Sequence, residues 1–424
     1  MHLPLLLLLF LLLQPLLLPL AGPGGAAAAP PGPPPPPPGP GPGNGAVPGA
    51  PRGSSRAAGP VRVENRYLYW GAAPTAAERA RLRAMHADQA ARWFAWASGG
   101  RAEVAFADVF ERLGAEELDA AGQCKYGSGG GKFQWNYPNT TALGAPAADD
   151  VDVVFFTVLA ETCGNSCGTT AGRAGPTWTG TVVECTMIRP YIFGGTFTCD
   201  PEAAAYGTTL CDSVYVHEMV HALCLQYHQN AVQCPPGAAS WRDCPAVEYG
   251  NKMDVLGGGG GWAGLSEGMA AKSRYDLNWL DHGADVELVT EAAARAVGKR
   301  TIMLAPLDGG RVAHPRPVVV TFDKASVGTL WLEYRAGSGF DAKLAGTANA
   351  GGLLAYHWGH ILVDLAPAAG GTAGTAADYR RAALPAGQSW TDPATGLELR
   401  RLRTESARGG SLGALVFSLE FGAG

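Results

Sequence analysis

The chain has 424 residues, enough for two domains, and 47% of them are apolar, which supplies ample core for both. Its 32 basic and 37 acidic residues leave a net charge of only −5, which excludes an electrostatic case for nucleic acid or an anionic membrane as the main partner. The function must therefore be argued from a site.

The first 60 residues predict no folded core. Residues 3–20 are a nearly unbroken leucine tract followed by small residues, which is typical of a secretory signal, and we place the signal at residues 1–21. Pro15 and Pro19 break the helix that a membrane anchor would need. Residues 22–60 are mostly Gly, Ala and Pro, a composition typical of an extended linker. We expect a secreted protein with no membrane partner once the signal is removed.

Nine cysteines in an exported chain indicate disulfides and leave at least one thiol unpaired or paired with another molecule. The close spacings of Cys163 with Cys167 and of Cys234 with Cys244 favour local pairs, and Cys224 is the candidate for the odd thiol. The acceptor sequon for N-glycosylation that begins at Asn139 fits an exported surface loop.

Residues 61–285 are predicted to form the first domain. A strand in VRVENRYLYW precedes a helix over 76–96, and further strands follow in RAEVAFADVF and DVDVVFFTVLA. More strand-like sequence lies at 177–198, and Asp212 or Ser213 can then cap a helix through SVYVHEMVHALCL. Strands and helices in this order predict an α+β fold.

Residues 286–424 are predicted to form a second domain. Short β-rich runs, spaced by Gly, Ala and Pro turns, indicate a β-sandwich: TIMLAPL, RPVVVTF, TLWLEYRA, GGLLAYHW and GALVFSLEF. No internal repeat is evident at a solenoid period.

The segment His217-Glu218-Met219-Val220-His221 carries the chemistry. Two imidazoles four residues apart on a helix emerge on one face and can share a zinc ion. Glu218 projects beside that face, where its carboxylate can take a proton from the metal-bound water and later give it to the leaving amine. The apolar flanks of this helix predict that it is buried, so its polar side chains need partners.

A third zinc ligand is needed, and His228 is the candidate. If the helix continued, its rise of ~1.5 Å per residue would place His228 roughly 16 Å from His217. The chain must therefore leave the helix near residues 224–227 and fold back. Tyr227, Glu248 and His282 are the alternative ligands.

At these residues the sequence resembles the metzincin zinc proteases, and within them the gametolysin family of algal cell-wall lytic enzymes. The resemblance is carried by VHEMVHALCLQYHQN, by the triplet at 248–250, by the segment 254–257 and by AGLSEGMAAKSRYDLNWL. It extends to WLEYRAGSGFDA and ALPAGQSWTDPATG, so it covers most of the chain after about residue 60. It implies a protease domain built on a mixed sheet with a long active-site helix, followed by the β-sandwich.

The resemblance also implies roles for single residues. His217, His221 and the histidine of the returning chain would bind Zn²⁺, and Glu218 would be the general base. The segment 254–257 would form the turn beneath the metal.

Two positions depart from the family's pattern. Cys224 and Tyr227 stand where the family has a glycine and the third histidine, and His228 comes one residue later, which a one-residue insertion in the turn would reconcile. The turn beneath the metal usually carries methionine, whereas this chain has Leu256, with Met253 three residues earlier. Leucine is an apolar substitute, because that methionine packs under the site and does not ligate.

The remaining histidines are given ordinary roles. His357 and His360 have a spacing that could bind a metal, but they lie in a β-rich segment without a nearby glutamate at the required position, so a structural or surface role is favoured. His86 and His314 are treated in the same way.

The sequence thus predicts a secreted zinc endopeptidase. The resemblance suggests Pro-rich or hydroxyproline-rich glycoproteins of a cell wall or extracellular matrix as substrates. The competing hypothesis is a catalytically silent matrix or binding protein that keeps the fold while an imperfect third ligand weakens the metal. A carbohydrate-binding or protein-binding role for residues 286–424 is a third possibility.

Overall fold

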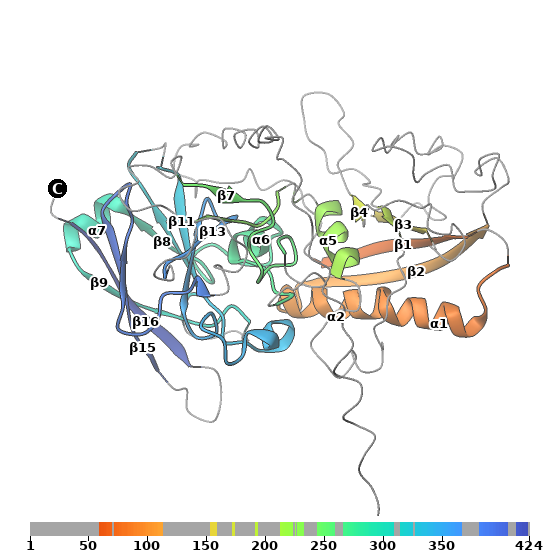
Figure 1. Cartoon of the computed structure of the whole chain (residues 1–424). Helices are drawn as coiled ribbons and strands as arrows, with labels where there is room; N and C mark the ends of the chain where they lie inside the picture. The colour runs from red at the N-terminus through yellow and green to blue at the C-terminus, as the bar shows by residue number, and fades with distance from the viewer. Residues whose placement is uncertain are drawn as a thin grey trace, which may run out of the picture. The chain divides into compact units, whose positions relative to one another are not determined.

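The protein is described here from a computed structural model, drawn in Figure 1. The described residues are 59–69, 72–112, 153–158, 172–173, 191–193, 213–223, 225, 227–232, 244–258, 266–308, 314–324, 327–366, 381–405 and 413–422. Contacts divide the chain into units 1–40 and 41–424, and all described residues belong to the second. The predicted signal, most of the linker, the sequon at Asn139 and eight of the nine cysteines lie outside the described residues. Cys244 is described, and it is disulfide-bonded.

A mixed five-stranded sheet begins the fold. The chain order is strand, two helices, strand, strand, as the sequence predicts, except that the helix expected over 76–96 is divided at His86. The strands lie in the order β2-β1-β3-β5-β4; all neighbours are parallel except β4, which pairs antiparallel with β5. The elements are β1 Gly59–Tyr69, α1 Ala76–Met85, α2 Ala87–Ala97, β2 Ala102–Arg112, β3 Val153–Val158, β4 Gly172–Arg173 and β5 Tyr191–Phe193.

Helix α5 (Ser213–Ala222) packs into the core of this sheet. It begins at Ser213, as predicted, and its Val216, Met219 and Val220 share one apolar cluster with residues of β1, β3 and α2. Tyr215 stacks on His86, with ring centroids 4.9 Å apart, and approaches Phe155 of β3 to 4.4 Å. The helix that carries both motif histidines is thus fixed by burial.

Two further sheets contain all the other strands of the described residues. The first has seven strands in the order β7-β6-β13-β12-β11-β10-β8, and the second has four in the order β14-β15-β16-β9. Their bounds are β6 Asn230–Val232, β7 Ala246–Val247, β8 Glu287–Thr290, β9 Arg300–Leu304, β10 Pro317–Thr321, β11 Thr329–Tyr334, β12 Leu353–His357, β13 Ile361–Val363, β14 Ser389–Thr391, β15 Leu397–Glu405 and β16 Ala414–Phe421.

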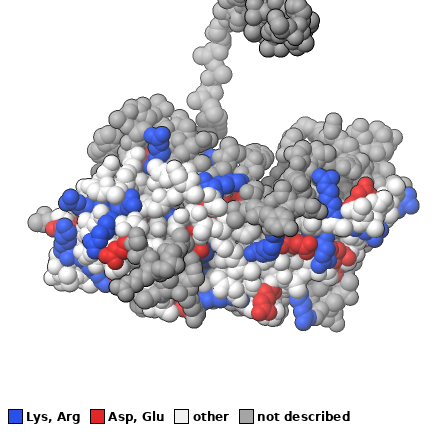
Figure 2. Space-filling view, turned by 90° about the horizontal axis from the view of Figure 1, so that it is seen from below, with Lys and Arg blue, Asp and Glu red and all other residues white. Residues whose placement is uncertain are grey.

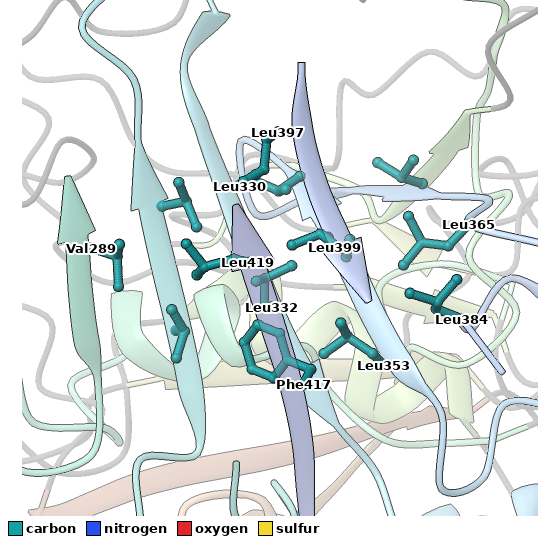
Figure 3. Close-up of a cluster of buried hydrophobic side chains, with 14 of the residues drawn as sticks. Val289, Leu330, Leu332, Leu353, Leu365, Leu384, Leu397, Leu399, Phe417 and Leu419 are labelled. Atoms are coloured by element: carbon teal, nitrogen blue, oxygen red, sulfur yellow. The ribbon is translucent and has the colours of Figure 1, made fainter. Parts of the chain in front are cut away.

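These two sheets share an apolar core. Figure 3 shows Leu330, Leu332 and Leu353 of the larger sheet beside Leu399 and Phe417 of the smaller one. Two sheets that bury their inner faces against each other have the arrangement of a β-sandwich.

The larger sheet is buried on its opposite face as well. There Val319, Trp331 and Leu354 pack with residues of α6 (Ala271–Asp276). Strands of a sheet covered on both faces are buried along their length, and β11 and β12 are buried at every position. Helix α7 (Glu291–Val297) and the 3-10 helix η5 (Gly339–Leu344) complete the described elements.

The larger sheet contains strands from both predicted domains. Strands β6 and β7 precede residue 286, and β6 pairs in parallel with β13. The division into domains 61–285 and 286–424 stays a prediction, whereas the α+β class is observed.

The surface carries charges of both signs. Figure 2 shows basic and acidic residues scattered over one face of the described part, in line with the small net charge. Among the described residues, no helix has the length and apolarity needed to cross a bilayer.

The buried imidazole of His357 predicts a pH dependence of stability. This side chain is 2% exposed in β12 and donates from Nε2 to the carbonyl of Val327, and burial lowers its pKa from 6.5 to about 4. Between pH 6.5 and 4 the unfolded chain therefore binds a proton here that the folded chain does not, so stability falls as the pH falls through this window.

In the wild-type protein we expect His357 to lower the free energy of unfolding by on the order of 2 to 3 kcal/mol between pH 6.5 and 4. His357→Gln should remove this contribution to the pH dependence. Urea unfolding of both proteins across this range measures it. Parallel curves for the two proteins would contradict the assignment.

Candidate metal centre

Three histidines from two segments of the chain converge. His217, His221 and His228 each offer a ring nitrogen, and these atoms all lie within 4.8 Å of one another. The Nε2 atoms of His217 and His221, one turn apart on α5, are 3.0 Å apart. The ring of His228 lies 5.6 Å from that of His217 and 5.1 Å from that of His221, measured between centroids. The predicted ligands are therefore brought together.

The other ring nitrogen of each histidine faces an oxygen. Nδ1 of His217 lies 2.7 Å from the carbonyl oxygen of Val255, and Nδ1 of His221 contacts the carbonyl oxygen of Leu225. Nδ1 of His228 lies 3.4 Å from Oε1 of Glu248. A carbonyl or carboxylate oxygen only accepts, so each Nδ1 carries the proton and each Nε2 has a lone pair. In His228 this lone pair accepts from the hydroxyl of Tyr249 across 2.9 Å, so a metal would take the place of that hydrogen bond.

The spacing of these lone pairs fits a cation. Two unprotonated nitrogens that face each other across 3.0 Å repel unless a positive centre lies between them. Zinc–nitrogen bonds of about 2.0 to 2.1 Å in tetrahedral geometry put ligand nitrogens about 3.3 Å apart. The Nε2 atoms of His221 and His217 are close to that value, and the ligand atom of His228 lies within 4.8 Å of both.

The protonation states of the three rings also suit a metal. Burial lowers the pKa of His217 to about 3 and that of His221 to about 4, and it lowers the pKa of His228 as well. A lowered pKa keeps an imidazole neutral at physiological pH, and the neutral ring is the form that binds metals.

The chain leaves the helix as the third ligand requires. Helix α5 ends at Ala222, slightly before the expected range, and Tyr227 then turns away from the histidines. Its hydroxyl donates to Oδ2 of Asp276 across 2.8 Å, and the ring lies 5.1 Å from that of His360. With Tyr227 anchored in this way, the next residue, His228, faces His217 and His221.

The other two alternatives for the third ligand lie elsewhere. Glu248 contacts Nδ1 of His228, which is the side away from the shared Nε2 position. His282 is exposed, forms an isolated bridge with Val286 and does not join the histidine group. Of the candidates, the geometry thus brings only His228 to the pair on α5.

A turn at residues 254–257 supports two of the histidines. The carbonyl of Val255 accepts from His217, and the carbonyl of Leu256 accepts from the backbone N–H of Gln229, next to His228, across 2.9 Å. Leu256 is buried in the same apolar cluster as α5, whereas Met253 belongs to the cluster around α6. Leucine, not the earlier methionine, therefore packs with the motif helix.

Glu218 follows His217 on α5 and is 5% exposed. Burial raises the pKa of Tyr249 to about 12, and the negative charges of Glu248 and Glu218 contribute to the rise.

Sequence reasoning missed the role of Tyr249. Its hydroxyl lies 2.9 Å from Nε2 of His228, and its ring lies 4.1 Å from the imidazole. Its backbone has a φ of 54°, and its N–H donates to Oδ1 of Asn230. Only the resemblance pointed to the triplet at 248–250, because no periodicity marks a tyrosine in a turn.

No protein-family model matches the chain, and no curated protein or solved structure is found to be similar to it.

The geometry predicts that His228 is needed for metal binding and His282 is not. Loss of a residue that only orients a ligand costs about 10- to 100-fold in metal affinity, so we expect His228→Ala to weaken zinc binding by more than about 100-fold. His282→Ala removes an imidazole from an exposed position and is the matched control. Competition with a chromogenic chelator measures both dissociation constants, and equal effects of the two variants would rule out His228.

Proposed function

We propose that the chain is a secreted zinc-dependent endopeptidase. The observation that carries the proposal is the convergence of one ring nitrogen from each of three histidines, all of which have an acceptor at Nδ1, beside the buried carboxylate of Glu218. This set of donors fits a zinc ion with three protein ligands and one open position.

The metal and Glu218 would have separate roles in hydrolysis. Zinc bound there would lower the pKa of a water molecule toward ~7 and polarise the scissile carbonyl. Glu218 would accept the proton of the attacking water and pass it to the leaving amine. Its burial favours this role, because a carboxylate shielded from solvent keeps its proton-transfer partner within the site.

The architecture supports the inference of a metzincin-like protease. Such a protease combines a mixed sheet with an active-site helix, a returning chain that brings the third histidine, and an apolar turn beneath the metal. Here the sheet has three parallel pairings and one antiparallel edge strand, and α5 packs into its core. The approach of His228 to the pair on α5 and the contact of the turn at 254–257 with His217 support the same inference.

We further propose Pro-rich or hydroxyproline-rich glycoproteins of a cell wall or extracellular matrix as substrates, and an extracellular location. The resemblance to gametolysins and the Pro-rich composition of residues 22–60 support the substrate class. The disulfide at Cys244 supports an oxidising compartment.

Replacing Glu218 separates an enzyme from a silent metal-binding protein. Glu218→Gln keeps the shape of the side chain and removes its basicity, so zinc content should be unchanged while hydrolysis falls by about 10²- to 10⁴-fold. Glu103→Gln makes the same chemical change at an exposed position of β2 and should leave hydrolysis unchanged.

The assay follows cleavage of a denatured protein and of a Pro-rich glycoprotein by mass spectrometry, together with zinc content. A wild-type chain that holds zinc and cleaves neither substrate would favour the silent matrix protein.

A further inference from the structure

A buried ionic cluster lies at the end of β11. Glu333, Arg335 and Asp341 are each 0% exposed. Nε of Arg335 lies 2.8 Å from Oε1 of Glu333, and Nη1 lies 3.3 Å from Oδ1 of Asp341 in η5. We call these three residues the arginine cluster. Burying charges is costly unless every one is paired, so such a cluster must hold a defined geometry.

The arginine cluster also contacts both ends of the segment 253–271, which leads into α6. Nη1 of Arg335 donates to the carbonyl of Met253, and Nη2 lies 3.9 Å from Oδ2 of Asp254, which is fully buried. Oε2 of Glu333 accepts from the backbone N–H of Ala271 across 2.7 Å. Both ends of the segment 253–271 are thus held by residues from β11 and the position that follows it.

The same segment contacts His217. Oδ1 of Asp254 accepts from the N–H of Leu256 across 2.8 Å, and Oδ2 accepts from the N–H of Ala270, which closes the turn. The carbonyl of Val255 in this turn is the acceptor for His217. Arg335 is therefore connected to His217 by its hydrogen bond to Met253, by the backbone of residues 253–255 and by the hydrogen bond between Val255 and His217.

Close packing leaves the path little freedom. A Cβ on Gly268 would lie 2.1 Å from Oδ1 of Asp341 and 2.7 Å from Nη1 of Arg335, so only glycine fits beside the arginine cluster. The N–H of Val255 donates to the carbonyl of this glycine across 2.9 Å. A movement of Arg335 would therefore displace Gly268 and, through its hydrogen bond with Val255, the turn at 254–257.

We propose that Arg335 is a positioning residue of the metal centre: through Met253 and Asp254 it fixes the turn at 254–257 and so aims His217 at the metal. The inference rests on the proposed metal centre. It makes residues after 285 part of the site, although none of them contributes a ligand.

The shape of the guanidinium is what the role requires. Arginine presents its donors in a fixed planar fork, and here they reach Glu333, the carbonyl of Met253 and Asp341 together. A lysine ammonium keeps the charge but cannot span these acceptors. Arg335→Lys thus removes the geometry and leaves the charge.

The test compares two arginine-to-lysine changes in the full chain. Arg335→Lys should weaken zinc binding by about 10- to 100-fold, the range found for residues that orient metal ligands. The matched control is Arg316→Lys, because Arg316 is also buried and pairs with buried Asp285 across 3.1 Å. This control should lower stability yet leave the zinc dissociation constant within about twofold, because Asp285 belongs neither to the turn at 254–257 nor to the histidine group.

A second readout follows the turn itself in the metal-free protein. Hydrogen exchange at the amides of Val255 and Leu256 should be faster in Arg335→Lys and unchanged in Arg316→Lys. If Arg335→Lys does not fold, Asp341→Asn, which removes one charge paired with Arg335, takes its place and should weaken zinc binding in the same direction.

The positioning role would be overturned if Arg335→Lys, or Asp341→Asn in its place, lowered stability as the control does but changed neither the zinc affinity nor the exchange at the turn. If the wild-type chain binds no zinc, the proposed function fails, and exchange at the turn alone decides whether Arg335 fixes it. Loss of peptide cleavage with zinc affinity unchanged would also count against the inference.

Discussion

The hydrogen bond from Nδ1 of His217 to the carbonyl of Val255 links the two parts of the site. On one side lies α5, held in the core of the five-stranded sheet, and on the other lies a turn held against the seven-stranded sheet. This bond sets the tautomer of His217 and thereby the direction of its free nitrogen. Comparable acceptors at Leu225 and Glu248 do the same for His221 and His228.

Local patterns in the sequence were enough to predict that three histidines come together. Two histidines four residues apart on an apolar helix must share a face, and the helix rise shows that His228 can join them only if the chain turns back. The structure has that return, and Tyr227 explains it, because its hydroxyl is drawn to Asp276 and away from the histidines. That contact is not evident in sequence, because Asp276 lies on a later helix.

Long-range pairing set the limit of prediction for the fold. Strands β9, β10, β11, β12 and β16 were predicted from their apolar runs, whereas β8, β13, β14 and β15 were not. The three residues of β6 likewise give no sign that they pair with β13. Arg335 was read as part of a β-rich run, and its contacts with Met253 and Asp254 depend on sheets packed by the whole chain. Buried ion pairs have no sequence period, so residues of this kind are found only in the folded protein.

The account depends most directly on three imidazole nitrogens sharing one ion. X-ray absorption at the zinc edge, on the full chain loaded with one equivalent of zinc, measures the number and distance of the ligands. We expect three nitrogen ligands of histidine at about 2.0 to 2.1 Å, with two in His228→Ala. A spectrum with fewer than three histidine ligands in the wild-type chain, or one unchanged by the loss of His228, would contradict the proposed centre.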